Sequence, residues 1–209
     1  MTKTKQTNDV IAKPGGLSLR VLIVEDDTLV GLGLKSQLQA IGHTVVGHAG
    51  DSAQAADLYR AEKPDLVLVD IRLGKDDGIE LADELLMIRP CPLIIVSAYS
   101  DKELIERAGE AGFYGYLIKP VSQQALAAQI EVAVKRFNEA EQLRADKAKL
   151  ATDLENRKLM DRAKGILMKR TGLGEDDAHR RLQQESQRRR IPLPELCRRI
   201  IESDEVMGL

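Results

Sequence analysis

Five polar residues each stand at the end of a short apolar run, and their types suit phosphoryl-group chemistry. Glu25 and Asp26 follow the first run, and Asp70 follows the third. Ser97 follows the fourth run, and Lys119 ends the fifth. If the runs are parallel strands of one open sheet, their carboxyl ends all lie at the same edge of the sheet. Ligands of such sheets bind at that edge.

Three carboxylates that converge repel one another unless a cation lies between them. Ligand sets made only of oxygen favour a hard ion such as Mg²⁺. A metal-bound aspartate beside an ammonium and a hydroxyl is suited to attack phosphorus, while the lysine and the cation take up charge on the transferring oxygens. Taken singly, an acid after a strand is commonly a helix cap, which is our interpretation of Asp27. The complete set, in this order, favours a phosphoryl site.

The strands that must position these residues alternate with helical segments. The runs are continuously apolar, as in strands buried on both faces of a parallel sheet. They are Arg20–Val24, Thr44–Val46, Leu66–Val69, Leu93–Val96 and Tyr116–Ile118. Helical patterns follow them at residues 29–41, 52–62, 79–88, 101–111 and from 122 onward. This alternation predicts an α/β domain at residues 18–137, with a doubly wound, five-stranded parallel sheet.

The fifth helical pattern continues without a proline from Ser122 to Gly172. Within it, five residues recur at alternating three- and four-residue steps: Ala140, Leu143, Lys147, Leu150 and Leu154. This heptad-like stripe predicts a coiled-coil linker at residues 138–152. A single solvated helix is the alternative, because Lys147 and the later Arg157 interrupt the apolar seam.

The chain then folds back twice and forms a small three-helix bundle at residues 153–209. Gly172, Leu173 and Gly174 predict the first turn, and Asp177 occupies a capping position three residues later. The second break is at residues 191–194, where Pro194 suits a first helical turn.

The composition is that of a globular chain of 209 residues, 43% hydrophobic and 31% charged. The formal net charge is −2, so any nucleic-acid site must be a local basic patch. Cys91 and Cys197 have no metal-ligand spacing and are expected to be reduced thiols. No apolar run has the length of a membrane span. Residues 1–17 are polar, lack the apolar core of a signal peptide and predict a disordered tail, so we expect a cytoplasmic protein with no membrane partner.

Four motifs around the predicted site resemble the receiver domain of two-component response regulators, which has a flavodoxin-like fold. They are Val24–Asp27, Val69–Leu73, Val96–Ala98 and Tyr116–Pro120. The resemblance implies that Asp70 is the phosphoacceptor and that a sensor histidine kinase is the phosphodonor. It also implies that Mg²⁺ is held by Glu25, Asp26, Asp70 and the backbone carbonyl of Arg72.

The same resemblance assigns roles to residues of the later strands. Lys119 pairs with the phosphoryl group, while Ser97 and Tyr116 are the switch residues. The Lys119–Pro120 peptide bond is expected to be cis. Gly74 departs from the pattern because many receivers have proline there, and a looser loop after Asp70 is the expected consequence.

Two further motifs resemble the ANTAR domain, the RNA-binding output module of transcription antitermination regulators. They are Met160–Met168 and Gly172–Ala178. The family binds paired RNA stem-loops, and the expected RNA contacts here are Ala163, Lys164, Gly165, Arg188, Arg189 and Arg190. The chain departs from the pattern at His179 and Glu185, where the family usually has aromatic residues. His179 is still able to stack on a base, whereas Glu185 would repel phosphate.

Together these features predict a phosphorylation-controlled antiterminator that is not an enzyme and that forms a phosphorylation-dependent homodimer on RNA stem-loops. A second hypothesis is a regulator whose helical output domain binds a protein partner and no RNA. A DNA-binding regulator is disfavoured, because no helix-turn-helix is evident in residues 153–209.

Overall fold

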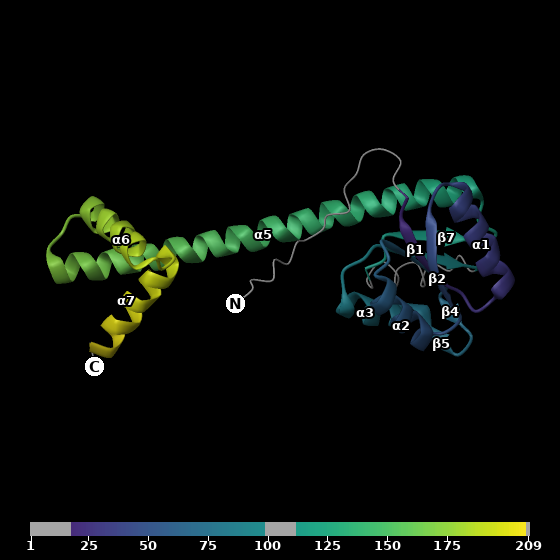
Figure 1. Ribbon diagram of the computed structural model, residues 1–209, viewed down its shortest axis with the longest axis horizontal. Helices are drawn as coiled ribbons and strands as arrows, with labels where there is room; N and C mark the ends of the chain where they lie inside the picture. The colour runs from purple at the N-terminus through teal and green to yellow at the C-terminus, as the bar shows by residue number, and fades with distance from the viewer. Residues whose placement is uncertain (1–17, 99–111, 208–209) are drawn as a thin grey trace. The chain divides into compact units, whose positions relative to one another are not determined.

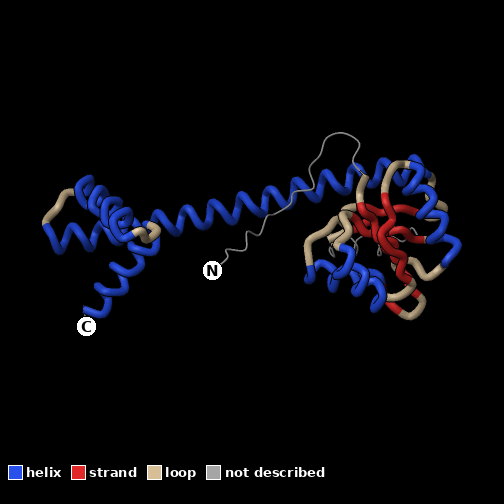
Figure 2. The backbone as a smooth tube through the Cα atoms, viewed as in Figure 1, coloured by secondary structure: helices blue, strands red, loops and turns tan. Residues whose placement is uncertain are grey.

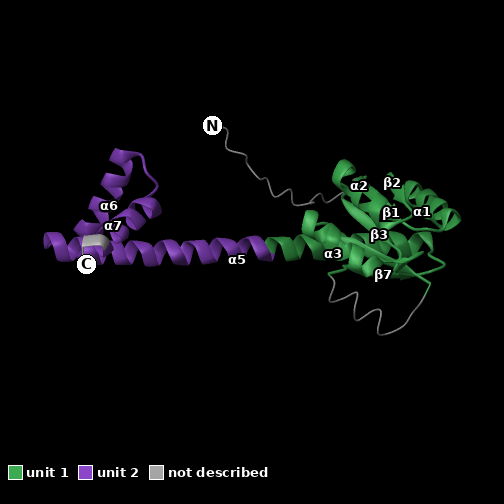
Figure 3. Ribbon diagram, turned by 90° about the horizontal axis from the view of Figure 1, so that it is seen from below, with its two compact units in different colours: residues 1–142 green, residues 143–209 purple. Residues whose placement is uncertain are grey.

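The computed structural model describes residues 18–98 and 112–207 of the chain. The chain divides into two compact units, residues 1–142 and 143–209 (Figure 3). The predicted disordered tail at residues 1–17 and the predicted helix at residues 101–111 fall outside the described residues.

The first unit is built on one parallel sheet of five strands (Figure 1). In chain order the strands are β1 (Arg20–Val24), β2 (Thr44–Ala49), β3 (Leu66–Val69), β6 (Leu93–Ser97) and β7 (Gly115–Ile118). Their order in the sheet is β2-β1-β3-β6-β7, the flavodoxin-like order. The predicted sheet is therefore confirmed, although β2 continues to Ala49.

Helices cover both faces of the sheet, as expected for strands without polar alternation (Figure 2). They are α1 (Thr28–Ala40), α2 (Ser52–Glu62), α3 (Gly78–Ile88) and the start of α5 (Gln123–Thr171). On β1, Val21 and Ile23 pack with apolar residues of α1 and α5. Leu22 and Val24 point to the other face and pack with α2 and α3.

A two-stranded hairpin, which the sequence did not predict, follows β3. Its strands are β4 (Arg72–Leu73) and β5 (Asp76–Asp77), joined by a two-residue turn. Gly74 occupies the first turn position with a φ of +62°, a conformation that glycine adopts readily and that the ring of proline excludes. The expectation of a looser loop is therefore wrong: Gly74 permits a paired turn at the point where the family pattern has proline.

The second unit is a three-helix bundle, as predicted. The later part of α5 packs with α6 (Glu175–Arg189) and α7 (Leu193–Met207) around Ala163, Leu182 and Cys197. Gly174 is the N-cap residue of α6, and the cap has no side-chain hydrogen bond. Asp177 instead bonds Arg180, at 2.7 Å, so its expected capping role is wrong. Helix α5 has 49 residues, yet no helix in the two described ranges is both long and apolar enough to cross a bilayer.

Gly78 links the packing of α3 to the position of Asp70. A Cβ at Gly78 would overlap the backbone carbonyl oxygen of Asp70, whereas a Cβ at Gly33 of α1 would meet nothing within 4 Å. We predict that Gly78→Ala destabilises the fold by ~1–3 kcal/mol, because neither backbone segment is free to move away. Gly33→Ala is the matched control and should gain up to about 1 kcal/mol from helix propensity. Urea unfolding measures both, and equal stability of the two variants would contradict the close approach.

Candidate functional site

The carboxyl ends of β1, β3 and β7 bring together the charged residues singled out in the sequence. One carboxylate oxygen from each of Glu25, Asp26 and Asp70 lies within 4.8 Å of the others. Glu25 and Asp70 are buried, at 1% and 8% relative exposure, while Asp26 is exposed. The predicted acidic cluster therefore exists as a three-dimensional group.

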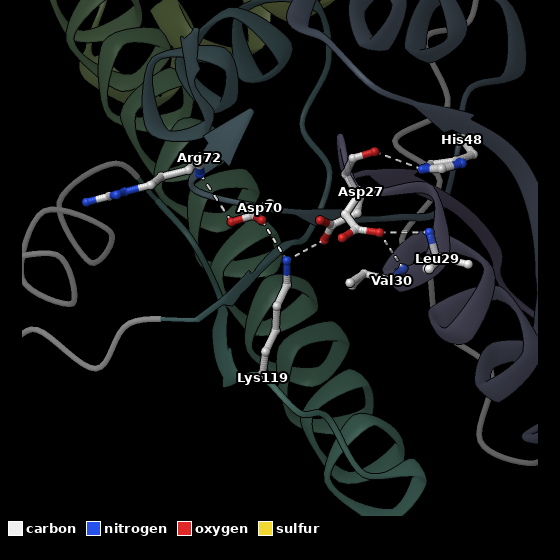
Figure 4. Close-up of polar contacts among 8 residues, drawn as sticks. Asp27, Leu29, Val30, His48, Asp70, Arg72 and Lys119 are labelled. Carbon is white, nitrogen blue, oxygen red and sulfur yellow. Dashed lines mark hydrogen bonds and ion pairs between the residues drawn. The ribbon is translucent and has the colours of Figure 1, made fainter. Parts of the chain in front are cut away.

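The Lys119 ammonium lies between two of these carboxylates (Figure 4). Its Nζ is 2.6 Å from Asp70 Oδ2 and 2.6 Å from Glu25 Oε2. Burial raises the pKa of Glu25 above its usual range, and Lys119 offsets only part of that shift. Burial acts to lower the pKa of Lys119, but hydrogen bonds with Asp70 and Glu25 raise it overall, so this ammonium stays charged.

Local hydrogen bonds orient the acids around this ion pair. Asp70 Oδ1 accepts the Arg72 N–H at 3.1 Å, which leaves Oδ2 directed at Lys119. Asp27 caps α1 by accepting from the N–H groups of Leu29 and Val30, so its expected structural role is confirmed. The role of the Arg72 carbonyl as a metal ligand stays a prediction.

Ser97 and Tyr116 occupy neighbouring strands on the same side of Asp70. Ser97 is 1% exposed at the end of β6, and its carbonyl accepts the Lys119 N–H at 2.8 Å. Tyr116 is half-buried on β7 and packs against a cluster of three isoleucines, Ile71, Ile79 and Ile95. The Lys119–Pro120 bond is cis, as the resemblance implied.

In the second unit, the expected RNA contacts on α5 differ in how accessible they are. Ala163 has 0% exposure in the bundle core, so its methyl group has a packing role. Lys164 is held by Asp161 at 3.0 Å and by Glu175 at 2.7 Å. A Cβ at Gly165 would meet nothing within 4 Å, so bundle packing does not require a glycine there.

Glu185 organises the arginines at the end of α6. Its carboxylate accepts two hydrogen bonds from Arg188, at 2.8 and 2.9 Å, and another from Arg189. These bonds, those from Arg188 first, lower the pKa of Glu185 to about 2. The two positive charges of Arg188 and Arg189 thus exceed the single negative charge of Glu185, which was expected to repel phosphate. Arg190 has left-handed backbone geometry, with φ of +55°, and is the C-cap residue of α6.

One face of α6 lines a surface pocket of about 560 Å³. Its lining residues recur at helical spacing: Leu173, Asp177, Arg180, Arg181, Gln184, Glu185 and Arg188. Arg180 and Arg181 add to the local positive charge that the sequence offers for phosphate contact, together with Arg188, Arg189 and Arg190. The three- and four-residue spacing from Asp177 to Arg188 places the pocket residues on one face of α6.

Comparison with known families gives two matches along the chain. Residues 21–131 match the response regulator receiver domain, and residues 148–201 match the ANTAR domain. The transcriptional regulatory protein PdtaR of Mycobacterium tuberculosis is 39% identical over 184 residues, which covers 88% of this chain and 90% of the relative.

Two solved receiver domains are similar to part of this chain. The signal receiver domain of a modulated diguanylate cyclase from Desulfovibrio desulfuricans has a TM-score of 0.55 and 34% identity, covering 59% of this chain and 99% of that chain. A CheY-like receiver domain protein from Methanospirillum hungatei has a TM-score of 0.54 and 28% identity, with the same two coverages.

The shared Lys119 contact predicts how Glu25 responds when the lysine is removed. In Lys119→Met, the buried Glu25 carboxylate loses its ammonium partner while Asp70 still repels it, so the pKa of Glu25 should rise further. Carboxyl-carbon NMR titration in magnesium-free buffer measures this change. Lys35→Met, at an exposed position of α1, is the control for loss of one positive charge. An unchanged Glu25 titration in Lys119→Met would show that the ion pair does not form in solution.

Proposed function

Because the chain belongs to the response regulators that join a receiver domain to an ANTAR domain, we propose that it is an RNA-binding antiterminator controlled by phosphorylation of Asp70. Both matched families are regulatory. The observation that carries the proposal is the group of three carboxylates at the carboxyl edge of the sheet, two of which are paired with the Lys119 ammonium.

In this proposal a sensor histidine kinase donates the phosphoryl group. An Asp70 carboxylate oxygen attacks phosphorus, the bond from phosphorus to the phosphohistidine nitrogen breaks, and an acyl phosphate forms. Lys119 exchanges its bond to Asp70 for contact with the phosphoryl oxygens. Glu25, Asp26, Asp70 and the Arg72 carbonyl would hold Mg²⁺, which offsets negative charge during transfer. The residues fit that ion, because three carboxylates converge where one ammonium pairs with two of them, which leaves negative charge in excess.

Ser97 and Tyr116 are positioned to carry the change away from Asp70. The Ser97 hydroxyl would bond the phosphoryl group, and the Tyr116 ring would then pack into the space this movement opens. Its half-buried position beside Ile95 and Ile71 supports two packing arrangements of the ring.

Labelling tests the phosphoacceptor directly. Incubation with acetyl phosphate and Mg²⁺ should add one phosphoryl group to the wild-type chain, measured by intact mass, and none to Asp70→Asn, which lacks the nucleophilic carboxylate. Asp76→Asn, an exposed acid on the nearby hairpin, is the matched control and should be labelled normally. Equal labelling of Asp70→Asn and wild type would remove Asp70 from its proposed role.

The α6 pocket supports RNA binding by the second unit. Arg180, Arg181 and Arg188 line it, and two of them are oriented by acids: Arg180 by Asp177, and Arg188 by Glu185. Guanidinium groups held in fixed geometry suit phosphate oxygens. We assign Arg181, Arg188 and Arg189 to a phosphate-binding surface. Arg188 and Arg189 are among the RNA contacts expected from the sequence, and Arg181 is included because it lines the pocket.

The salt dependence of RNA affinity distinguishes phosphate contacts on this surface from a general electrostatic attraction between the protein and RNA. Arg181→Ala should weaken binding of an RNA with two adjacent stem-loops, and should reduce the magnitude of the slope of log K against log salt by about 0.7–0.9, the loss of one phosphate contact. Arg60→Ala, on α2 of the first unit, removes the same charge and should leave the slope unchanged. If no structured RNA binds, with or without acetyl phosphate, the protein-partner hypothesis replaces RNA binding.

Helix α5 supplies the proposed dimer contact. We assign residues 138–152 of this helix to a linker between a domain at residues 18–137 and a domain at residues 153–209. Leu143, Leu150 and Leu154 of the heptad-like stripe are exposed by 57%, 68% and 55%. A second copy of the chain would cover these leucines if the two helices paired along the stripe.

The charges beside the stripe favour parallel pairing. Glu139, Asp146 and Asp153 occupy one flank, and Arg144 and Lys158 occupy the other. In a parallel pair, Glu139 faces Arg144 of the second copy and Asp153 faces Lys158 of the second copy. An antiparallel pair would place acids opposite acids. Lys147 lies in the seam and weakens the pairing, so we propose that the dimer forms when the receiver is phosphorylated.

Substitution of the central lysine tests this dimer. Lys147→Leu completes the apolar seam and should produce a dimer even without acetyl phosphate, measured by sedimentation velocity. Lys149→Leu makes the same change on the outer face of α5 and should stay monomeric until phosphorylated. The stripe is not the dimer contact if both variants sediment like wild type in each state.

A further inference from the structure

The half-buried imidazole ring of His48 packs against α1 at a place where α1 has a glycine, Gly31, instead of a larger residue. It lies on β2, paired in register with Ile23 of β1. A Cβ at Gly31 would overlap the His48 ring atoms Nε2 and Cε1. Gly31 is itself buried, so the helix surface leaves a space there that the imidazole fills.

This ring makes a hydrogen bond with the backbone of the acidic cluster (Figure 4). His48 Nε2 lies 2.9 Å from the Glu25 carbonyl oxygen. A carbonyl oxygen only accepts, so Nε2 carries the hydrogen and donates. Strand β1 ends at Val24, and the imidazole therefore supplies a donor to a carbonyl just beyond that strand.

Each polar part of Glu25 has its own partner, two of them on β2 and the third at the end of β7. Its N–H donates to the Ala49 carbonyl at the end of β2, at 2.9 Å. Its carbonyl accepts from His48, and its carboxylate lies 2.6 Å from Lys119 at the end of β7. Of these three contacts, the one from His48 constrains the peptide unit that joins Glu25 to Asp26, and so the relative direction of the two acids.

We infer that His48 is a positioning residue for the cation-binding acids: it holds the Glu25–Asp26 peptide so that both carboxylates meet the ion with Asp70. The inference rests on the proposed phosphorylation of Asp70 in the presence of Mg²⁺. A hydrogen bond that orients a ligand from behind typically changes metal affinity by about 10- to 100-fold. Because His48 acts through the backbone, we expect an effect near the lower of these values.

The experiment measures the rate of phosphorylation of the full chain by acetyl phosphate as a function of Mg²⁺ concentration. His48→Leu fills a similar volume without a donor and should raise the half-saturating Mg²⁺ concentration by about tenfold, with the limiting rate unchanged. His48→Gln places an amide nitrogen near the position of Nε2 and should restore the wild-type value. His48→Asn is too short to do so and should behave like His48→Leu.

A second pair of variants leaves His48 itself intact. Gly31→Ala displaces the ring and should shift the Mg²⁺ dependence in the same direction as His48→Leu. Gly33→Ala, two residues along α1 and facing open space, should match wild type. Thermal unfolding of every variant identifies any that fails to fold. If a His48 variant does not fold, the Mg²⁺ dependence of Gly31→Ala is compared with that of Gly33→Ala instead.

Two results would overturn the inference. One is a His48→Leu titration that coincides with wild type, and the other is an equal shift in His48→Leu and His48→Gln, which would indicate a packing role alone. In both cases wild type is phosphorylated, so the proposed function survives. A wild-type chain that takes up no phosphoryl group would overturn the proposed function, and this inference with it.

Discussion

Repulsion among three carboxylates at one edge of the sheet is the constraint around which the first unit is arranged. Two unit charges about 5 Å apart interact by roughly 3 kcal/mol at an effective dielectric constant of ~20. Several such terms are comparable with the whole stability of a domain, about 5–15 kcal/mol. Glu25, Asp26 and Asp70 therefore need positive charge nearby, and Lys119 supplies it in the structure. The same need makes the cluster responsive to a cation or to a phosphoryl group.

The strand order explains how one lysine serves two acids. Strands β1 and β3 are neighbours, so Glu25 and Asp70 start close together. Strand β7 lies two positions from β3, roughly 10 Å away at the usual strand spacing. The four-carbon stem of Lys119 carries its ammonium from β7 toward the acids, and Nζ lies 2.6 Å from both Asp70 Oδ2 and Glu25 Oε2. A phosphoryl group on Asp70 would compete for this ammonium, and so alter contacts at the ends of three strands.

Charge pairing plays a different part in the second unit, where the groups are exposed. Exposed ion pairs contribute little to stability, so the pairs on α6 are better understood as restraints on side-chain direction. Glu185 holds Arg188 and Arg189, and Asp177 holds Arg180. The acids that separate these arginines in the sequence thus orient guanidinium groups along the helix. A glutamate at a position usually aromatic in the family is compatible with a basic surface for this reason.

The sequence alone determined the sheet, its strands, the acidic cluster and the two families, because buried parallel strands are continuously apolar and the site residues stand at their ends. Asp27 as a helix cap followed from the same local rules. Only the tertiary structure decided which groups touch: the double contact of Lys119, the burial of Ala163, and the fit of His48 into the space over Gly31. The hairpin at Gly74 was also missed, because two-residue strands carry no periodic signal. Local patterns report which face of an element is buried, whereas contacts between elements depend on packing distances that only the folded chain sets.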